Sequence, residues 1–160
     1  MKHLLSAAVA ALTLSIAPAV QAHEIEAGDL QIIHPSIPQP LTRSMSAAGY
    51  MVISNDGDTD ERLLAIEVPI ATSAQIHTTI HGTDGVARME HVEALDIPAG
   101  DVVKLERGGH HVMLIGLSKG LVEGDMVEAT LVFERAGRVA VEFMVDPARG
   151  AHGSDGGHKH

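Results

Sequence analysis

Short runs of β-branched residues, separated by turn residues, most constrain what this chain can fold into. The runs are rich in Val, Ile and Thr, and no long segment repeats apolar residues at a helical period. Gly, Asn, Asp and Pro gather between the runs, for example at residues 55–58 and at Gly137, where turns are expected. We predict strands at residues 30–33, 47–54, 62–68, 74–79, 86–91, 101–105, 111–117, 126–133 and 139–145. Strands of this length and spacing are typical of a two-sheet β-sandwich.

A proline-rich stretch at residues 34–40 interrupts the pattern. Pro35, Pro38 and Pro40 each lack the backbone N–H that a central strand must donate. We therefore predict a surface connection or an edge strand there, and we assign a structural role to His34.

The first 22 residues have the three parts of a secretory signal peptide. A basic start at Lys2 precedes an apolar run at residues 4–16, and small residues lead up to Ala22. The run is shorter than the roughly 20 residues of a membrane-spanning helix, and Pro18 follows it closely. We predict cleavage after Ala22, export to the periplasm and no membrane insertion afterwards. No cysteine follows the run, so we expect no lipid anchor.

The length of 160 residues allows one ordinary domain, which we place at residues 23–149. Residues 150–160 hold four glycines and no aliphatic residue larger than alanine, which is typical of a flexible, His-rich tail. Without residues 1–22, ten Lys and Arg face twenty-one Asp and Glu. This acidic balance argues against nucleic acid as a partner, because no basic patch could replace the counterions of phosphates.

Eleven histidines, seven methionines and the absence of cysteine direct attention to metal binding. His111 and Met113 are two apart and therefore share one face of a strand. Taken alone, Met113 is more typical of core packing than of metal binding. A hairpin with its turn at residues 82–85 would bring His77 and Met89 close across neighbouring strands. Together these residues make a candidate site of two histidines and two methionines.

The types of ligand favour a particular metal. Thioethers are soft and uncharged, so two methionines with two histidines favour Cu(I) over Zn(II). A blue-copper electron-transfer site needs a cysteine thiolate, which this chain lacks. Further histidines are candidates for additional ligands or for the rim of the site, and those at the two chain ends are candidates for Cu(II). They are His81, His91, His23, His152, His158 and His160.

Met89, twenty-one intervening residues and His111-x-Met113 resemble the motif of the periplasmic copper chaperones called PCuAC. Residues 47–50 (Ala-Ala-Gly-Tyr), 97–100 (Ile-Pro-Ala-Gly) and 111–117 are also similar to that family. The family has ten residues between its first histidine and the methionine, whereas eleven lie between His77 and Met89. We place the extra residue in the turn, where insertions are tolerated. Both His77 and His81 therefore remain candidates for the first ligand.

The resemblance implies an all-β, Greek-key β-sandwich of the cupredoxin-like or immunoglobulin-like kind, with about nine strands. It also implies a Cu(I) chaperone that uses His77, Met89, His111 and Met113. Such a chaperone would pass copper by ligand exchange to the copper subunit of respiratory cytochrome oxidase, or exchange it with another copper chaperone, without catalysing a reaction.

Two other classes of function are compatible with the same residues. A periplasmic copper-buffering or resistance protein would use the same ligands without a dedicated acceptor. An oxidative enzyme could use His23 as an N-terminal copper ligand, but the chain has only three aromatic residues with which to bind a polysaccharide. It also lacks a Gly-x-Ser-x-Gly motif, a thiol pair and a phosphate-binding loop. We therefore expect a protein that is not an enzyme.

Overall fold

The computed structural model describes residues 24–41, 43–83 and 85–148. These residues form eleven strands and no helix, and so contain no helix that could cross a membrane. The strands are β1 (Glu24–Ala27), β2 (Leu30–Pro38), β3 (Ser46–Asn55), β4 (Glu61–Glu67), β5 (Ala71–His81), β6 (Ala87–Val92), β7 (Leu95–Ile97), β8 (Val102–Leu105), β9 (His110–Leu117), β10 (Met126–Phe133) and β11 (Arg138–Asp146). The predicted signal peptide and tail, with His23, His152, His158 and His160, lie outside the described residues.

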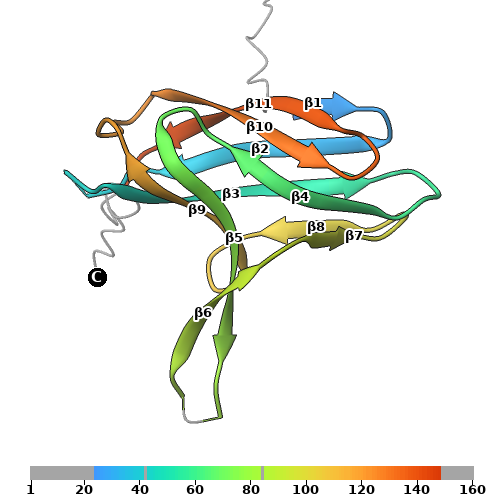
Figure 1. Ribbon diagram of the computed structural model, residues 1–160, viewed down its shortest axis with the longest axis horizontal. Helices are drawn as coiled ribbons and strands as arrows, with labels where there is room; N and C mark the ends of the chain where they lie inside the picture. The colour runs from blue at the N-terminus through green and yellow to red at the C-terminus, as the bar shows by residue number, and fades with distance from the viewer. Residues whose placement is uncertain (1–23, 42, 84, 149–160) are drawn as a thin grey trace, which may run out of the picture.

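The strands form one continuous, mixed network in the order β6-β5-β9-β8-β3-β2-β11-β10-β4-β7, and β1 pairs with β2. Most pairs are antiparallel, whereas β11 runs parallel to β2 and β8 parallel to β9. β8 and β9 lie one after the other along β3, since β8 pairs with Met51–Ser54 and β9 with Ser46–Gly49. Figure 1 shows the strands stacked in layers, with the β5–β6 hairpin projecting from the body.

The interior is built from aliphatic side chains that alternate along the strands. Ile53, Leu63, Leu131 and Phe143 are almost fully buried and come from four different strands. Buried and more exposed residues alternate along β10 and β11, because successive side chains of a strand point to opposite faces. The predicted all-β fold is confirmed.

Two features of the strand pattern differ from the prediction. The short strands β1 and β7 were not predicted, and the described residues therefore hold eleven strands instead of about nine. The prediction for residues 34–40 was wrong, because β2 continues to Pro38 and lies between β3 and β11. The register shifts between Ile33 and Ser36, and His34 has a φ of 49°. Pro35 falls in this bulge, where its missing N–H breaks no ladder bond.

A buried carboxylate holds the turn between β10 and β11. Glu61 is 5% exposed, and its Oε1 accepts hydrogen bonds from the backbone N–H groups of Arg62 and Arg135. Its Oε2 accepts a third bond from the N–H of Ala136. Burial raises the pKa of Glu61, but these backbone donors lower it by more, so the net shift is downward.

We expect Glu61→Gln to lower the free energy of unfolding by about 1–3 kcal/mol near pH 7, because the amide NH₂ would face a backbone donor. The folded-state pKa of Glu61 lies below the unfolded value, so its stabilising effect is present above the unfolded pKa. That effect disappears as the pH falls through the folded-state pKa. Urea denaturation near pH 7 and at about pH 3 should therefore show a difference between wild type and variant that shrinks in acid.

Candidate metal site

Three histidines from adjacent strands form a row across the sheet. In the β5–β6 pairing His77 is opposite His91, and in the β5–β9 pairing His77 is opposite His111. Directly paired residues point to the same face of a sheet. The ring centres of His77 and His91 are 6.0 Å apart, and those of His77 and His111 are 5.9 Å apart. His77 is therefore the middle member of the row.

The two predicted methionines lie on the same face, on either side of this row. Met113 follows His111 by two residues on β9 and is opposite Gln75. Met89 is opposite Thr79, which places it towards the tip of the hairpin. Met89, His111 and Met113 line one groove of about 610 Å³. His111 is 5% exposed in it, whereas Met89 is 66% exposed.

The imidazole of His111 is oriented by its own strand. Its Nδ1 lies 3.1 Å from the carbonyl oxygen of Gly109. A carbonyl can only accept, so Nδ1 carries the proton and donates it. The lone pair of Nε2 is then free to bind a metal ion, and an imidazole held by a backbone carbonyl is the usual arrangement of a metal-ligating histidine.

His77 also has one nitrogen occupied and one free. Its Nε2 donates to Gln75 Oε1 at 3.0 Å, and its Nδ1 is buried without a hydrogen-bond partner. Burial, together with the neighbouring His111 and His91, lowers the pKa of His77. The ring is consequently neutral near pH 7, and Nδ1 presents an unused lone pair. A buried nitrogen of this kind fits a metal ligand.

His81, the other candidate for the first ligand, lies further away. His81 shares the face of His77 but is opposite Ala87, four residues along β5 and close to the tip. At about 3.3 Å per residue, this separates His81 from His77 by about 13 Å along the strand. The structure thus brings His77, and not His81, beside His111. His110 is opposite Thr78 and faces the other side of the sheet from His77. His34 Nε2 lies 3.4 Å from Asp146 Oδ2.

Sequence reasoning did not identify the residues that hold the two imidazoles. Gln75 precedes His77 by two residues, and Gly109 precedes His111 by two, so each partner lies on the same strand or at its start. A polar residue two positions from a strand histidine is a signal that could have identified Gln75. A backbone carbonyl such as that of Gly109 carries no comparable signal in the sequence.

Among the described residues, no three His, Cys, Asp or Glu side chains are grouped to hold a metal ion. The row of three histidines does not converge on one point. A metal bound in this groove would therefore rely on methionine sulfur for part of its coordination, which favours a soft ion.

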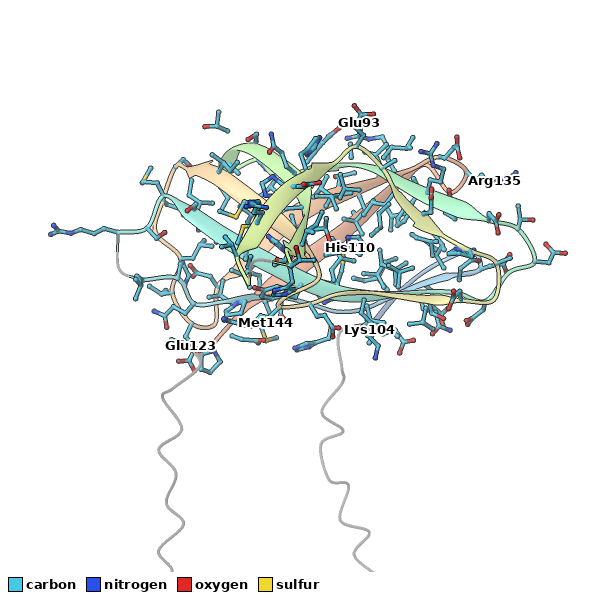
Figure 2. All side chains as sticks on the ribbon, turned by 90° about the horizontal axis from the view of Figure 1, so that it is seen from below. Glu93, Lys104, His110, Glu123, Arg135 and Met144 are labelled. Atoms are coloured by element: carbon cyan, nitrogen blue, oxygen red, sulfur yellow. The ribbon has the colours of Figure 1, made fainter. Side chains whose placement is uncertain are left out.

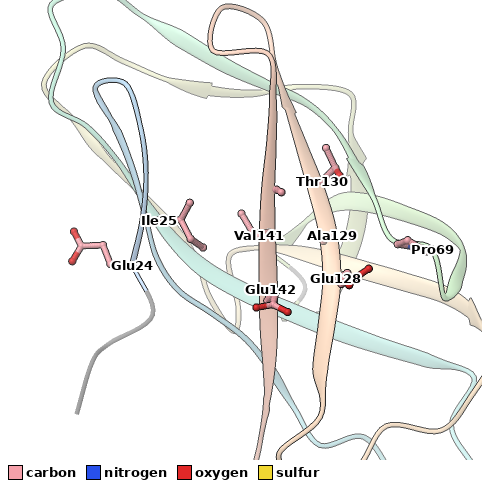
Figure 3. Close-up of a pocket in the computed structure, with 9 residues that line it drawn as sticks. Glu24, Ile25, Pro69, Glu128, Ala129, Thr130, Val141 and Glu142 are labelled. Atoms are coloured by element: carbon pink, nitrogen blue, oxygen red, sulfur yellow. The ribbon is translucent and has the colours of Figure 1, made fainter. Parts of the chain in front are cut away.

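A second groove lies on another part of the molecule and has a different character. Its volume is about 470 Å³, and its lining includes Glu24, Glu128 and Glu142 together with Ile25 and Val141 (Figure 3). None of the predicted ligands lines it.

In Figure 2 His110 lies near the middle of the view, whereas Arg135 and Glu123 lie near opposite ends of the body.

Removal of the acceptor that orients His77 tests whether that orientation matters. We expect Gln75→Leu to weaken Cu(I) binding about 10- to 100-fold, the usual effect of losing a residue that orients a metal ligand. Gln75→Glu keeps an oxygen acceptor and is the matched control, with affinity close to wild type. Competition with a chromophoric Cu(I) chelator measures both. Equal affinities for Gln75→Leu and wild type would show that the hydrogen bond has no part in binding.

The described residues form an all-β sandwich that carries histidines and methionines, and no cysteine, on one sheet face. Residues 30–145 match the family described as putative lipoprotein LpqE-like. The chain belongs to this family, which is the PCuAC family. One relative, the putative lipoprotein Lxx21020 of Leifsonia xyli subsp. xyli, is 29% identical over 105 residues, or 66% of this chain. The match spans 63% of that relative's length.

Solved structures with the same fold include copper-bound ones. The apo PCuAC domain from PmoF1 is 32% identical, with a TM-score of 0.69 over 78% of this chain and 99% of that domain. The copper-bound PCuAC domain from PmoF2 is 31% identical, with a TM-score of 0.67 over 78% of this chain and 98% of that domain. CuI-DR1885 from Deinococcus radiodurans is 30% identical, with a TM-score of 0.60 over 78% of this chain and 81% of that chain.

Proposed function

We propose that this protein is a periplasmic copper chaperone. It binds Cu(I) through His77, Met89, His111 and Met113 and delivers the ion to the copper centres of respiratory cytochrome oxidase. It catalyses no reaction. One observation carries the proposal: two histidines with free ring nitrogens lie beside each other on a sheet face that also carries two thioethers.

The copper-bound relatives support the choice of metal. PmoF2 and DR1885 are 31% and 30% identical to this chain and have copper-bound and CuI-bound structures, respectively. The donors of this chain fit the same ion, since imidazole and thioether both suit Cu(I). The location rests on the signal-like residues 1–22 and on the lipoprotein descriptions of the family and of one relative.

Delivery follows from the unequal exposure of the ligands. His111 is buried and fixed to the carbonyl of Gly109, so it holds its position whether or not copper is bound. Met89 is 66% exposed and provides a neutral, weak donor at the rim of the groove. An acceptor thiolate or imidazole can therefore displace Met89 first, while His111 keeps the ion in place. Stepwise exchange of this kind needs neither unfolding of the carrier nor release of free copper.

A transfer experiment tests the delivery step. The Cu(I)-loaded full chain is mixed under argon with the soluble, copper-free domain of the oxidase copper subunit, and the copper content of each is measured after separation. We expect copper to move to the oxidase domain. Retention of copper by the carrier at equilibrium would contradict delivery.

Deletion of the gene under copper limitation separates delivery from buffering. Loss of oxidase activity, restored by added copper, is the result expected for delivery. Sensitivity to excess copper with normal oxidase activity would instead assign the protein to copper buffering or resistance.

A further inference from the structure

The residue that lies directly opposite His77 on β6 is a histidine, not the predicted methionine ligand. His91 pairs with His77, whereas Met89 pairs with Thr79, two residues nearer the tip of the hairpin. His91 is exposed and lies on the outermost strand of the network. The four ligands proposed for Cu(I) do not include it. Its position beside an imidazole with a free nitrogen therefore calls for a function of its own.

The spacing of the two rings is compatible with one shared metal ion. A metal bound to imidazole nitrogen at about 2.0 Å lies about 3 Å from the ring centre, so two rings on one ion have centres at most about 6 Å apart. The centres of His77 and His91 are 6.0 Å apart, and the rings are nearly perpendicular, at 81°. His91 is exposed, so its ring can turn towards His77 without displacing core side chains.

We propose that His77 and His91 form a nitrogen-donor site for Cu(II), which is an alternative to the Cu(I) site and shares His77 with it. The inference rests on the proposed function in that His77 is also a Cu(I) ligand. The two modes use different partners of His77. Cu(II) is held with His91 of β6, whereas Cu(I) is held with His111 and Met113 of β9 and with Met89, two residues before His91 on β6.

The hydrogen bond of His77 makes the two modes exclude each other. Nε2 is occupied by Gln75, so Nδ1 is the single ring nitrogen with a free lone pair. One lone pair binds one ion at a time. A copper ion held by His77 and His91 therefore leaves His111 without its second imidazole, and the reverse also holds.

The chemistry of the pair selects the divalent ion. Two imidazoles form a harder donor set than the His/Met side of the groove, and Cu(II) binds such nitrogen sites more tightly than other first-row divalent ions. Because His91 is exposed, water can supply the remaining positions of a tetragonal Cu(II) ion. The soft ion prefers the sulfur-containing side. The oxidation state of copper thus decides which neighbour His77 binds with.

Paramagnetic line broadening locates the site in the full chain. Sub-stoichiometric Cu(II) is added to ¹⁵N-labelled protein, and the amide signals of residues 76–78 and 90–92 are followed. We expect both groups to broaden in wild type. In His91→Ala the broadening of residues 90–92 should be lost, and the Cu(II) dissociation constant at this site should rise at least about tenfold, the smallest effect seen even for residues that only orient a ligand.

Matched variants and a second ion distinguish the outcomes. His81→Ala removes an exposed histidine of the same hairpin and should leave the broadening intact. Met113→Leu should also leave Cu(II) broadening intact while it weakens Cu(I) binding. One equivalent of Cu(I), added under argon, should restore the signals of residues 90–92.

Hairpin broadening that persists in His91→Ala, or broadening confined to the chain ends, would overturn the Cu(II) site and leave the proposed Cu(I) function untouched. Unchanged Cu(I) affinity in Met113→Leu would instead contradict the proposed function alone. Amide signals of residues 90–92 that stay broadened after Cu(I) is added would refute the sharing of His77.

Discussion

Met113→Leu should lower the affinity for Cu(I) more than about 100-fold, because loss of a ligand exceeds the effect of losing a residue that merely orients one. Leucine keeps nearly the same volume and removes the sulfur, so the fold should be preserved. Met113 is opposite the small Ala48 on β3 and opposite Gln75 on β5. Competition with a chromophoric Cu(I) chelator measures the affinity.

A methionine outside the groove supplies the control. Met126 begins β10 and is 38% exposed, and it does not line the groove of Met113. Met126→Leu should bind Cu(I) as tightly as wild type. Thermal unfolding of both variants should stay close to wild type. If Met113→Leu bound Cu(I) as well as Met126→Leu does, the sulfur of Met113 would have no part in the site.

Gly116→Ala should lower the free energy of unfolding by about 2–5 kcal/mol, from the combined cost of a left-handed backbone and a steric overlap. Gly116 lies in β9 with a φ of +68°, a conformation that side chains other than glycine rarely adopt. An added Cβ would also lie 2.8 Å from Thr72 Cβ and still closer to its Oγ1. Urea denaturation measures the difference.

Two further variants separate the causes. Thr72→Ala in the Gly116→Ala background removes the overlap and should restore the part of the stability that the overlap costs, with the backbone strain remaining. Thr72 Oγ1 donates a hydrogen bond to the Gly116 carbonyl at 3.1 Å. The single variant Thr72→Ala measures the stability lost with this bond, which is then subtracted from the double variant. Gly120→Ala, where an added Cβ meets nothing within 4 Å, should be nearly neutral. A large loss there would contradict the steric argument.

The sequence was sufficient for the strands whose pattern is regular. The prediction of residues 126–133 coincides with β10, because polar and apolar residues alternate over residues 127–131 and β-branched and aromatic residues continue the run. The prediction failed at residues 34–38, where Pro35 and Pro38 outweighed the apolar residues around them. The bulge at His34 admits Pro35 into a central strand, and a local backbone change of this kind leaves no periodic signal. β1 and β7 are too short to show alternation at all.

The candidate site could be predicted as a set of residues but not as an arrangement. The two-residue spacing of His111 and Met113 places both on one face of any strand. The partner of His77 on β6 depends instead on the register of the hairpin, which the turn at residues 82–86 and the backbone ladder determine together. A slip of two residues would exchange His91 for Met89 opposite His77, with all side chains on the same faces. Sequence spacing alone does not distinguish these two pairings.

The projecting hairpin has a consequence for how this protein can change over time. β6 pairs with β5 alone, and of its residues only Val92, at the end away from the hairpin tip, packs against the buried core. Segments with few buried contacts open at a lower free energy than the core does. Substitutions in the hairpin can therefore alter the affinity for the metal with little effect on the stability of the sandwich. Affinity and folding are separately adjustable, so natural variation in metal preference should concentrate in the hairpin.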